Sequence, residues 1–469
     1  MTQRIIAAGI ILLGVIAHLF APVSFVASAR AEAPAVSLEA RLDRLVLDYY
    51  PAANEPGAAV LVTVDGKLVL RKAYGLADLE NGVKLTPDMI FRIGSITKQF
   101  TSVGILQLVQ AGRVSLDDSI TKYVPDFDTS GKTITIEHLL THTSGIPNIT
   151  ALPDFEAQMS KDFSPSQNIA RLAGKPLEFN PGEQFQYSNT NYLLLGMVIE
   201  KVSGKRYAEY FDASIAKPLG LADTRYSRDA SDDAPLTPRH AHGYELDDSG
   251  KWLPARPLSM TQPFAAGAIE STVDDLAKWT QALMDGKVVD PKLLESAWTP
   301  YKPSERPSDY GYGWSIRTEA GERWIGHNGG INGFQSAAVW IPEKKVFVAI
   351  LRNGIGIAAP EMLLRRLALE AVGRPEAKRV AISLPAETLD RYVGVYAISP
   401  RAKFTISRDG DKLFAEAPNK SKVELFAEAE DEFFSPESDV QFSFTVENEK
   451  AKQMTLHRAG REFLAKREE

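Results

Sequence analysis

The sequence predicts an α/β domain with a helical insertion, followed by a smaller all-β domain. Two observations carry this prediction. Strand-like patterns stand on both sides of a mostly helical section, about residues 113 to 270, so they are expected to join in one sheet. From Leu389 to the C-terminus the chain alternates like β structure, which is typical of a separate domain of about 85 residues.

The first section combines a helix with a hairpin. Leu38 to Tyr49 has the spacing of a short amphipathic helix. Two aliphatic runs follow, Ala58 to Val64 and Lys67 to Leu70, and they enclose the dipeptide Asp65-Gly66. Asp-Gly supplies the positive φ angles that a type I′ turn requires. We therefore expect an antiparallel hairpin here.

A buried helix opens the middle of the chain. From Ser95 onward, apolar residues recur at helical spacing without proline until Gly112 ends the pattern. Helical patterns with long polar loops continue from there. Residues 225 to 262 contain Pro, His and Asp and are too long for an ordinary connector, so we expect this excursion to border a site.

Strand patterns return in the last third of the first domain. They cover residues 312 to 316, 324 to 325, 334 to 341 and 345 to 351, and a helix is expected at residues 360 to 371. Gly373-Arg374-Pro375 opens a linker, and Asp409-Gly410 signals a hairpin in the second domain. The predicted domains are residues 38–375 and 385–469.

Composition restricts the chemistry. The chain has 469 residues, of which 44% are hydrophobic, so it has ample material for a core. Its 53 basic and 60 acidic residues give a net charge of −7, which argues against non-specific binding of nucleic acid. There is no cysteine, so disulfides, thiolate metal sites and cysteine nucleophiles are excluded. Any nucleophile must be an oxygen or a nitrogen.

The N-terminus has the pattern of an export signal. Arg4 precedes an apolar run from Ile5 to Phe20, and both Ala27-Ser28-Ala29 and Ala29-Arg30-Ala31 fit the rule for cleavage. We therefore expect residues 1–29 to be a signal peptide and the mature chain to be periplasmic or secreted, without a stable membrane span. The alternative is an uncleaved membrane anchor, because Ile5 to Val26 could just span a bilayer.

Serine followed three residues later by lysine occurs three times, at Ser95/Lys98, Ser119/Lys122 and Ser214/Lys217. Only Ser95 begins a buried helix, where Lys98 shares its face and burial favours the neutral amine. Asp117-Asp118 would hold Lys122 protonated in a surface turn, and Lys217 directly precedes a proline. Taken alone, this motif favours a helix cap for Ser95 over a catalytic role.

Two further motifs each occur once. Tyr187-Ser188-Asn189 follows a turn signal that would present Tyr187 near a loop. His327-Asn328-Gly329 is followed by Gly330 and stands at the end of a predicted strand, where glycines let a substrate backbone approach closely. The plainer interpretations are a packed aromatic side chain for Tyr187 and a turn histidine for His327.

In this order the three motifs resemble those of the penicillin-recognising serine hydrolases. Longer stretches are similar to the branch that contains class C β-lactamases, D,D-peptidases, D-aminopeptidases and related esterases: residues 91 to 98, 138 to 145 and 181 to 189. The resemblance covers about residues 40 to 375. It implies a β-lactamase-like antiparallel sheet flanked by helices, with an all-α insertion. Residues 385 to 469 are similar only to the small lipocalin-like β domains often appended to such enzymes.

The resemblance implies a role for each motif residue. Ser95 would attack a carbonyl and form an acyl-enzyme, while Lys98 and Tyr187 would share the work of general base. A neighbouring lysine would favour the Tyr187 phenolate. Asn189 would orient the substrate amide or Lys98. The backbone N–H groups of Ser95 and Gly330 would form the oxyanion hole, beside His327 and Gly329.

The third motif departs from the family pattern. Penicillin-active members usually carry a lysine where His327 stands, and histidine is charged only partly near pH 7. This favours an ester or peptide without a carboxylate at that position, including D-amino-acid substrates, over β-lactamase or D,D-carboxypeptidase activity. Asn353, with Arg352 before it, follows a returning strand and is the candidate for the missing polar contact.

A different class of function remains as an alternative. A binding or sensor protein could keep this fold without turnover and hold a ligand in its C-terminal domain. His138 and His142 lie four residues apart, but Leu139 stands where the zinc-protease signature requires glutamate, so we expect no metal and no cofactor. The expected partner is a small ester or peptide substrate. The oligomeric state is left open.

Overall fold

The computed structural model describes residues 36–227, 238–305, 308–356, 359–376, 379–399, 402–417, 422–435, 440–458 and 461–468. The predicted signal peptide lies outside these residues. Within them, no helix has both the length and the apolar character needed to cross a membrane.

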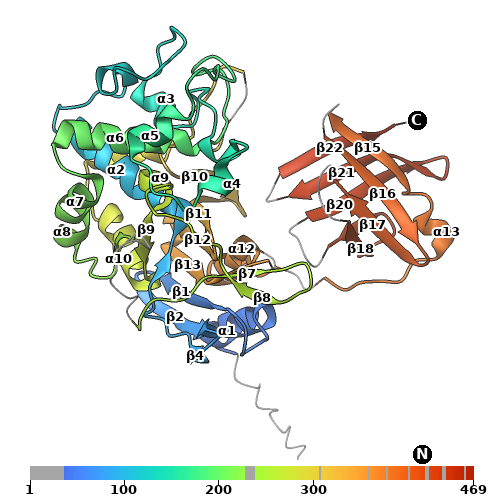
Figure 1. Ribbon diagram of the computed structural model, residues 1–469. Coiled ribbons are helices and arrows are strands. Elements are labelled where there is room, and N and C mark those ends of the chain that lie inside the picture. The colour runs from blue at the N-terminus through green and yellow to red at the C-terminus, as the bar shows by residue number, and fades with distance from the viewer. Residues whose placement is uncertain are drawn as a thin grey trace, which may run out of the picture. The chain divides into compact units, whose positions relative to one another are not determined.

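A six-stranded antiparallel sheet forms the centre of the first domain (Figure 1). Its strands are, in spatial order, β10 (Ser315–Glu319), β11 (Glu322–Ile331), β12 (Phe334–Ile341), β13 (Val346–Arg352), β1 (Ala58–Val64) and β2 (Lys67–Tyr74). β1 pairs with β13, with Ala58 opposite Arg352. Strands from before and after the helical section therefore join in one sheet, as the sequence predicts.

The hairpin and its flanking helices match their predictions closely. Asp65 and Gly66 have φ angles of 51° and 70°, as a type I′ turn requires. The second strand continues to Tyr74, beyond the predicted Leu70, because it stays paired with β1 through a bulge. The helices α1 (Leu38–Tyr49) and α12 (Pro360–Ala371) have the predicted bounds.

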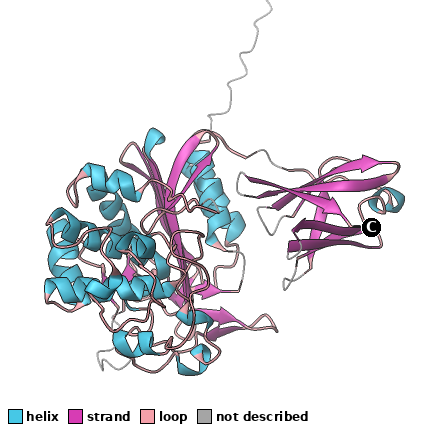
Figure 2. Ribbon diagram, turned by 90° about the horizontal axis from the view of Figure 1, so that it is seen from above, coloured by secondary structure: helices cyan, strands magenta, loops and turns pink. Residues whose placement is uncertain are grey.

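Helices cover both faces of the sheet (Figure 2). α1 and α12 pack on one face, against alternate β1 residues such as Val60 and Val62. Ala59 and Leu61 point to the other face, where the helical section packs. Its helices are α2 (Thr97–Gln110), α3 (Ile136–Leu140), α4 (Phe155–Gln158), α5 (Pro165–Ala170), α6 (Asn189–Ser203), α7 (Tyr207–Phe211), α8 (Lys217–Leu219), α9 (Phe264–Gly267), α10 (Val273–Met284) and α11 (Pro291–Ala297).

Short strands connect these layers. They are β3 (Leu76–Asp78), β4 (Val83–Lys84), β5 (Phe91–Arg92), β6 (Arg225–Tyr226), β7 (Tyr244–Leu246), β8 (Trp252–Pro254), β9 (Ile269–Ser271) and β14 (Gly354–Ile355). The antiparallel pairing of β5 with β9 brings the chain just before Ser95 beside the chain just after Gly267. These two segments carry groups of the site described below.

One strand differs from its prediction in a way that affects the site. The sequence predicts that a strand ends near Gly326, but β11 continues to Ile331. His327, Gly329 and Gly330 therefore lie inside a paired strand, opposite residues of β12, and not in a turn. The three glycines in this stretch lower its β propensity, and tertiary pairing overrides that preference.

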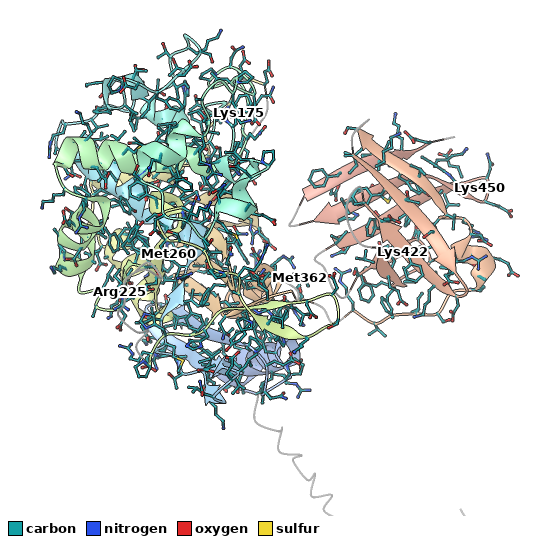
Figure 3. All side chains as sticks on the ribbon, viewed as in Figure 1. Lys175, Arg225, Met260, Met362, Lys422 and Lys450 are labelled. Atoms are coloured by element: carbon teal, nitrogen blue, oxygen red, sulfur yellow. The ribbon has the colours of Figure 1, made fainter. Side chains whose placement is uncertain are left out.

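The second domain is a closed eight-stranded antiparallel barrel, as predicted. Its strands are β15 (Gly394–Ser399), β16 (Ala402–Asp409), β17 (Lys412–Glu416), β18 (Val423–Ala427), β19 (Glu432–Phe434), β20 (Val440–Glu447), β21 (Lys450–Arg458) and β22 (Arg461–Arg467), and α13 (Ala386–Leu389) precedes them. Lys450, labelled in Figure 3, begins β21. The rings of Tyr392, Phe433 and Phe444 pack 4.9 to 5.6 Å apart, so these described side chains form a solid apolar core.

Candidate active site

Ser95 occupies a tight turn at the start of a buried helix. It lies in the 3₁₀ turn Gly94–Ile96, which leads directly into α2. Gly94 has a φ of 51°, a conformation that favours glycine. Lys98, one turn later, is fully buried, and its Nζ lies 3.0 Å from Ser95 Oγ. Ser95 itself is half-buried.

Two acceptors fix the amine of Lys98. Its Nζ donates to Asn189 Oδ1 at 2.9 Å and to the backbone oxygen of Ala266 at 2.8 Å. Burial lowers the pKa of Lys98 well below its ordinary value, which favours the neutral amine. A neutral amine has two N–H groups, and these two acceptors occupy both. In that neutral form the lone pair faces Ser95 Oγ and can accept the serine proton.

The Tyr187 hydroxyl meets the same serine oxygen. It donates to Ser95 Oγ at 2.8 Å. Burial raises the pKa of Tyr187 above the ordinary value for a phenol. The expectation that lysine favours the phenolate is therefore wrong, because the cost of burying a phenolate is the largest influence on this pKa. Tyr187 remains a hydrogen-bond donor, and Lys98 is the group able to act as base.

Asn189 is held by a residue that the sequence reasoning missed. Asn189 begins α6, and its backbone N–H donates to Asn148 Oδ1 at 3.1 Å, while its side-chain amide donates to the same oxygen at 3.4 Å. This leaves Asn189 Oδ1 directed at Lys98. Asn148 stands three residues beyond the motif stretch that ends at Gly145, and no pattern in one sequence distinguishes it.

Gly329 allows β11 to lie against the serine turn. A Cβ atom at Gly329 would lie 2.1 Å from the backbone oxygen of Ile93 and 2.4 Å from Ser336 Oγ. Ser336 Oγ donates to that Ile93 oxygen at 2.8 Å and holds the two segments together. A Cβ at Gly94 would lie 2.9 Å from the Gly330 nitrogen, so the Gly330 amide stands beside the serine turn.

Gly329→Ala is expected to destabilise the first domain, because the nearest atom is the backbone oxygen of Ile93, which cannot move aside. We expect a loss of about 2 kcal/mol or more, measured as a lowered midpoint of thermal unfolding. Gly330→Ala is the matched control, since its Cβ would meet nothing within 4 Å and should leave the midpoint unchanged. Equal midpoints for the two variants would contradict this account of the close approach.

His327 is a buried neutral imidazole. Its Nε2 accepts from the Tyr310 hydroxyl at 2.8 Å, and its Nδ1 donates to the Asn328 backbone oxygen at 2.5 Å. Burial is the main reason that the pKa of His327 is lowered to about 3, and the charge of a protonated Lys98 lowers it further. The expected partial charge near pH 7 is therefore wrong. Tyr310 was not singled out in the sequence, although it opens the repeated Tyr-Gly pattern at residues 310–314.

Asn353 is a structural residue, which corrects its predicted contact with substrate. Its side chain is fully buried and accepts from the Gly57 N–H at 2.9 Å. It donates to the backbone oxygens of Leu76 at 3.0 Å and His242 at 2.9 Å. Because its amide joins three segments, Asn353 offers no group to a substrate. Arg352 is also fully buried, with its guanidinium 5.5 Å from the ring centre of Tyr50.

The other two serine–lysine pairs have surface lysines, as was predicted for Lys122. Lys122 is exposed and forms an ion pair with Asp118 at 2.8 Å, which raises the pKa of the lysine. Ser119 Oγ accepts from the Thr121 N–H and caps a short 3₁₀ turn. Lys217 is exposed and pairs with Asp212 at 2.6 Å. Each of these lysines is exposed and paired with a carboxylate, in contrast to the buried Lys98.

The long excursion at residues 225–262 reaches the turn after β11, where Asn332 Nδ2 donates to the Arg256 backbone oxygen at 2.9 Å. Residues 228–237 of this excursion lie outside the described part of the chain. Elsewhere among the described residues, Asp78, Glu80 and His242 bring possible metal-ligand atoms within 4.8 Å of one another. Hydrogen bonds from Asn81 and Tyr244 already reach these carboxylates, and we assign no ion there.

Comparisons with known proteins agree with this geometry. The Beta-lactamase family model matches residues 42–373, and a domain of unknown function, DUF3471, matches residues 378–468. Penicillin-binding protein 4* of Bacillus subtilis is 27% identical over 87% of this chain and 94% of its own length.

Solved structures give the same relationship. The octameric penicillin-binding protein homologue from Pyrococcus abyssi is 30% identical, with a TM-score of 0.66, over 91% of this chain and 99% of that one. D-amino acid amidase from Ochrobactrum anthropi is 28% identical, with a TM-score of 0.56, over 68% and 92%. The chain therefore belongs to the Beta-lactamase family and is a serine hydrolase with an appended DUF3471 domain.

Proposed function

We propose that this protein is an exported hydrolase that cleaves esters or amides through an acyl-enzyme on Ser95, with D-amino acid amides among its substrates. The observation that carries the proposal is the setting of Ser95 Oγ, which lies 3.0 Å from a buried amine and 2.8 Å from a phenol. The two neighbours are complementary, because Lys98 can accept a proton and Tyr187 can donate a hydrogen bond to the forming alkoxide.

The proposed reaction has two halves. Ser95 Oγ attacks the carbonyl carbon while its proton passes to Lys98 Nζ, and the negative oxygen is received by the N–H groups of Ser95 and Gly330. The bond to the leaving group breaks, and the alcohol or amine departs with that proton. Water then attacks the acyl ester, gives a proton to Lys98, and releases the acid. Lys98 returns the proton to Ser95 Oγ, so the enzyme is regenerated.

The uncharged histidine of the third motif supports the proposal of substrates without a carboxylate. Where penicillin-active members hold a lysine, this chain has buried His327, whose pKa of about 3 leaves it uncharged at neutral pH. A substrate carboxylate that binds at this position would be desolvated without forming an ion pair in return. The similarity to a D-amino acid amidase supports uncharged amide substrates of D configuration.

Substrate selectivity is expected to be independent of pH between 5 and 8. Since His327 stays neutral throughout this range, the ratio of kcat/KM for a neutral ester to that for its carboxylate-bearing analogue should remain constant. The measurement uses a pair of aryl esters, one neutral and one with a carboxylate that is ionised at every pH between 5 and 8. A histidine with an ordinary pKa near 6.5 would instead shift the ratio severalfold towards the carboxylate at pH 5.

A substrate panel tests the proposed function. The purified mature chain is treated with a fluorophosphonate probe and assayed on short acyl esters, D- and L-phenylalanine amide and a chromogenic cephalosporin. Labelling with turnover of esters or D-amides supports the proposal. Labelling without turnover of any compound favours the binding or sensor protein, and preferred turnover of the cephalosporin favours a β-lactamase. Absence of labelling refutes the serine mechanism.

Export and partners are part of the same proposal. We propose that residues 1–29 are removed as a signal peptide and that the mature chain acts on small molecules outside the cytoplasm, without nucleic acid. The N-terminal sequence of the protein recovered after export tests this, and Arg30 is the expected first residue. An N-terminus at residue 1 in a membrane fraction would favour the anchored alternative.

A further inference from the structure

We propose that His142 is a positioning residue for the catalytic tyrosine, and this inference rests on the proposed function. His142 is fully buried, and it holds the segment that carries Tyr187 through its backbone, its ring nitrogen and its ring face. It acts through Tyr187 and is placed in no direct contact with the substrate.

Two hydrogen bonds bracket Tyr187. The backbone N–H of Gln186 donates to the His142 backbone oxygen at 2.9 Å, and the N–H of Ser188 donates to His142 Nδ1 at 3.3 Å. The residues on both sides of Tyr187 are thus bound to one histidine. Because this segment is a loop before α6, it has no helix or sheet ladder to fix it.

The His142 ring supports the Tyr187 ring directly. Their centres are 4.2 Å apart with an angle of 40° between the planes. Tyr192 and Tyr310 approach the same imidazole, with ring centres at 5.1 Å and 4.9 Å. The hydroxyl of Tyr187 must hold its 2.8 Å bond to Ser95, and displacement of a catalytic group by about 1 Å can cost 10²-fold in rate.

The ring nitrogens show that the imidazole is used as a neutral acceptor. Nδ1 receives the Ser188 N–H and lies 3.2 Å from Asn191 Nδ2, so it carries no proton. Nε2 is buried and has no hydrogen-bond partner among the described residues. Among the described residues the ring therefore makes its hydrogen bonds through Nδ1 alone, to the Tyr187 segment and to Asn191 at the start of α6.

The backbone at His142 is also unusual. Its φ is 56°, in the left-handed region that non-glycine residues rarely occupy. This conformation costs about 1 kcal/mol for a residue with a Cβ, and asparagine tolerates it better than most. Strain at a buried residue that contacts a catalytic segment is typical of a functional constraint.

A double-mutant cycle tests the inference. The variants are His142→Phe, which keeps a ring but removes the acceptor, His142→Asn, which keeps an acceptor near Nδ1, and each of these combined with Tyr187→Phe. The readouts are kcat and KM for p-nitrophenyl butyrate, the rate of fluorophosphonate labelling, and the thermal midpoint. His138→Phe is the matched control, because it removes a similar bond to the Thr135 N–H that has no connection to Tyr187.

We expect His142→Phe to lower kcat about tenfold or more with little change in KM, and His142→Asn to restore part of the loss. In the Tyr187→Phe background the same substitution should change kcat less than twofold. Additive losses, or a loss equal to that of His138→Phe, would overturn the inference. If the wild-type protein is neither labelled nor active, the proposed function fails instead.

Discussion

Ser95→Ala is expected to abolish fluorophosphonate labelling and to lower kcat for acyl esters by at least about 10⁴-fold. The reason is that no other described hydroxyl has both of the neighbours that Ser95 has, an amine at 3.0 Å and a donating phenol at 2.8 Å. Removing Oγ removes the nucleophile but leaves the turn intact, since the backbone of Gly94–Ile96 does not depend on it. The measurement is intact mass after probe treatment, together with ester turnover.

Ser119→Ala is the matched control within the same chain. Ser119 also stands three residues before a lysine, but Lys122 is exposed and paired with Asp118. The control should therefore be labelled and active like the wild type, with at most about 1 kcal/mol of stability lost from the missing cap. Continued labelling of the Ser95→Ala protein would show that another nucleophile carries the reaction.

The sequence identified the site mainly where neighbours are close along the chain. Ser95 and Lys98 are one helical turn apart, so helix geometry alone places them together. The bounds of α1 and α12 could be predicted because amphipathic spacing, proline and glycine mark them. Tyr187 was found only through its motif, since its contact with Ser95 joins residues that are 92 positions apart.

Properties set by burial were not predictable in the same way. The family resemblance and ordinary side-chain pKa values suggested a partly charged His327 and a Tyr187 phenolate, but both residues are desolvated and neutral. The prediction for Asn353 failed for a different reason. An amide that follows a strand can bind a substrate or join backbone segments, and only the three hydrogen-bond partners of Asn353 show that its role is structural. His142 likewise depends on a φ angle and a ring contact that no sequence pattern records.

Lys98→Met is expected to lower kcat by about 10³-fold or more while Ser95 remains in place, because the base is lost and the nucleophile is kept. Methionine fills a similar volume, and its thioether cannot accept the serine proton effectively. Slow residual labelling of Ser95 by the fluorophosphonate would separate this variant from Ser95→Ala. A rate within tenfold of the wild type would instead assign the base to Tyr187.

Lys98→Met should also show whether the Lys98 amine is neutral, through the pH dependence of the free energy of unfolding. In the unfolded chain Lys98 has its ordinary pKa near 10.5, and burial lowers that pKa in the folded protein. Between the two values the unfolded state binds a proton that the folded state does not, so this lysine contributes stability that grows as the pH rises towards its ordinary pKa. Lys98→Met lacks this contribution.

The stability of Lys98→Met relative to the wild type is therefore expected to fall with rising pH, by up to about 1.4 kcal/mol per unit. Urea unfolding of both proteins at pH 7, 8 and 9 measures this difference, and all other titrating groups cancel because the two proteins share them. A difference that is constant with pH would mean that the folded protein holds Lys98 as a cation. In that case its lone pair would not be available to Ser95, and a base other than this lysine would have to start the reaction.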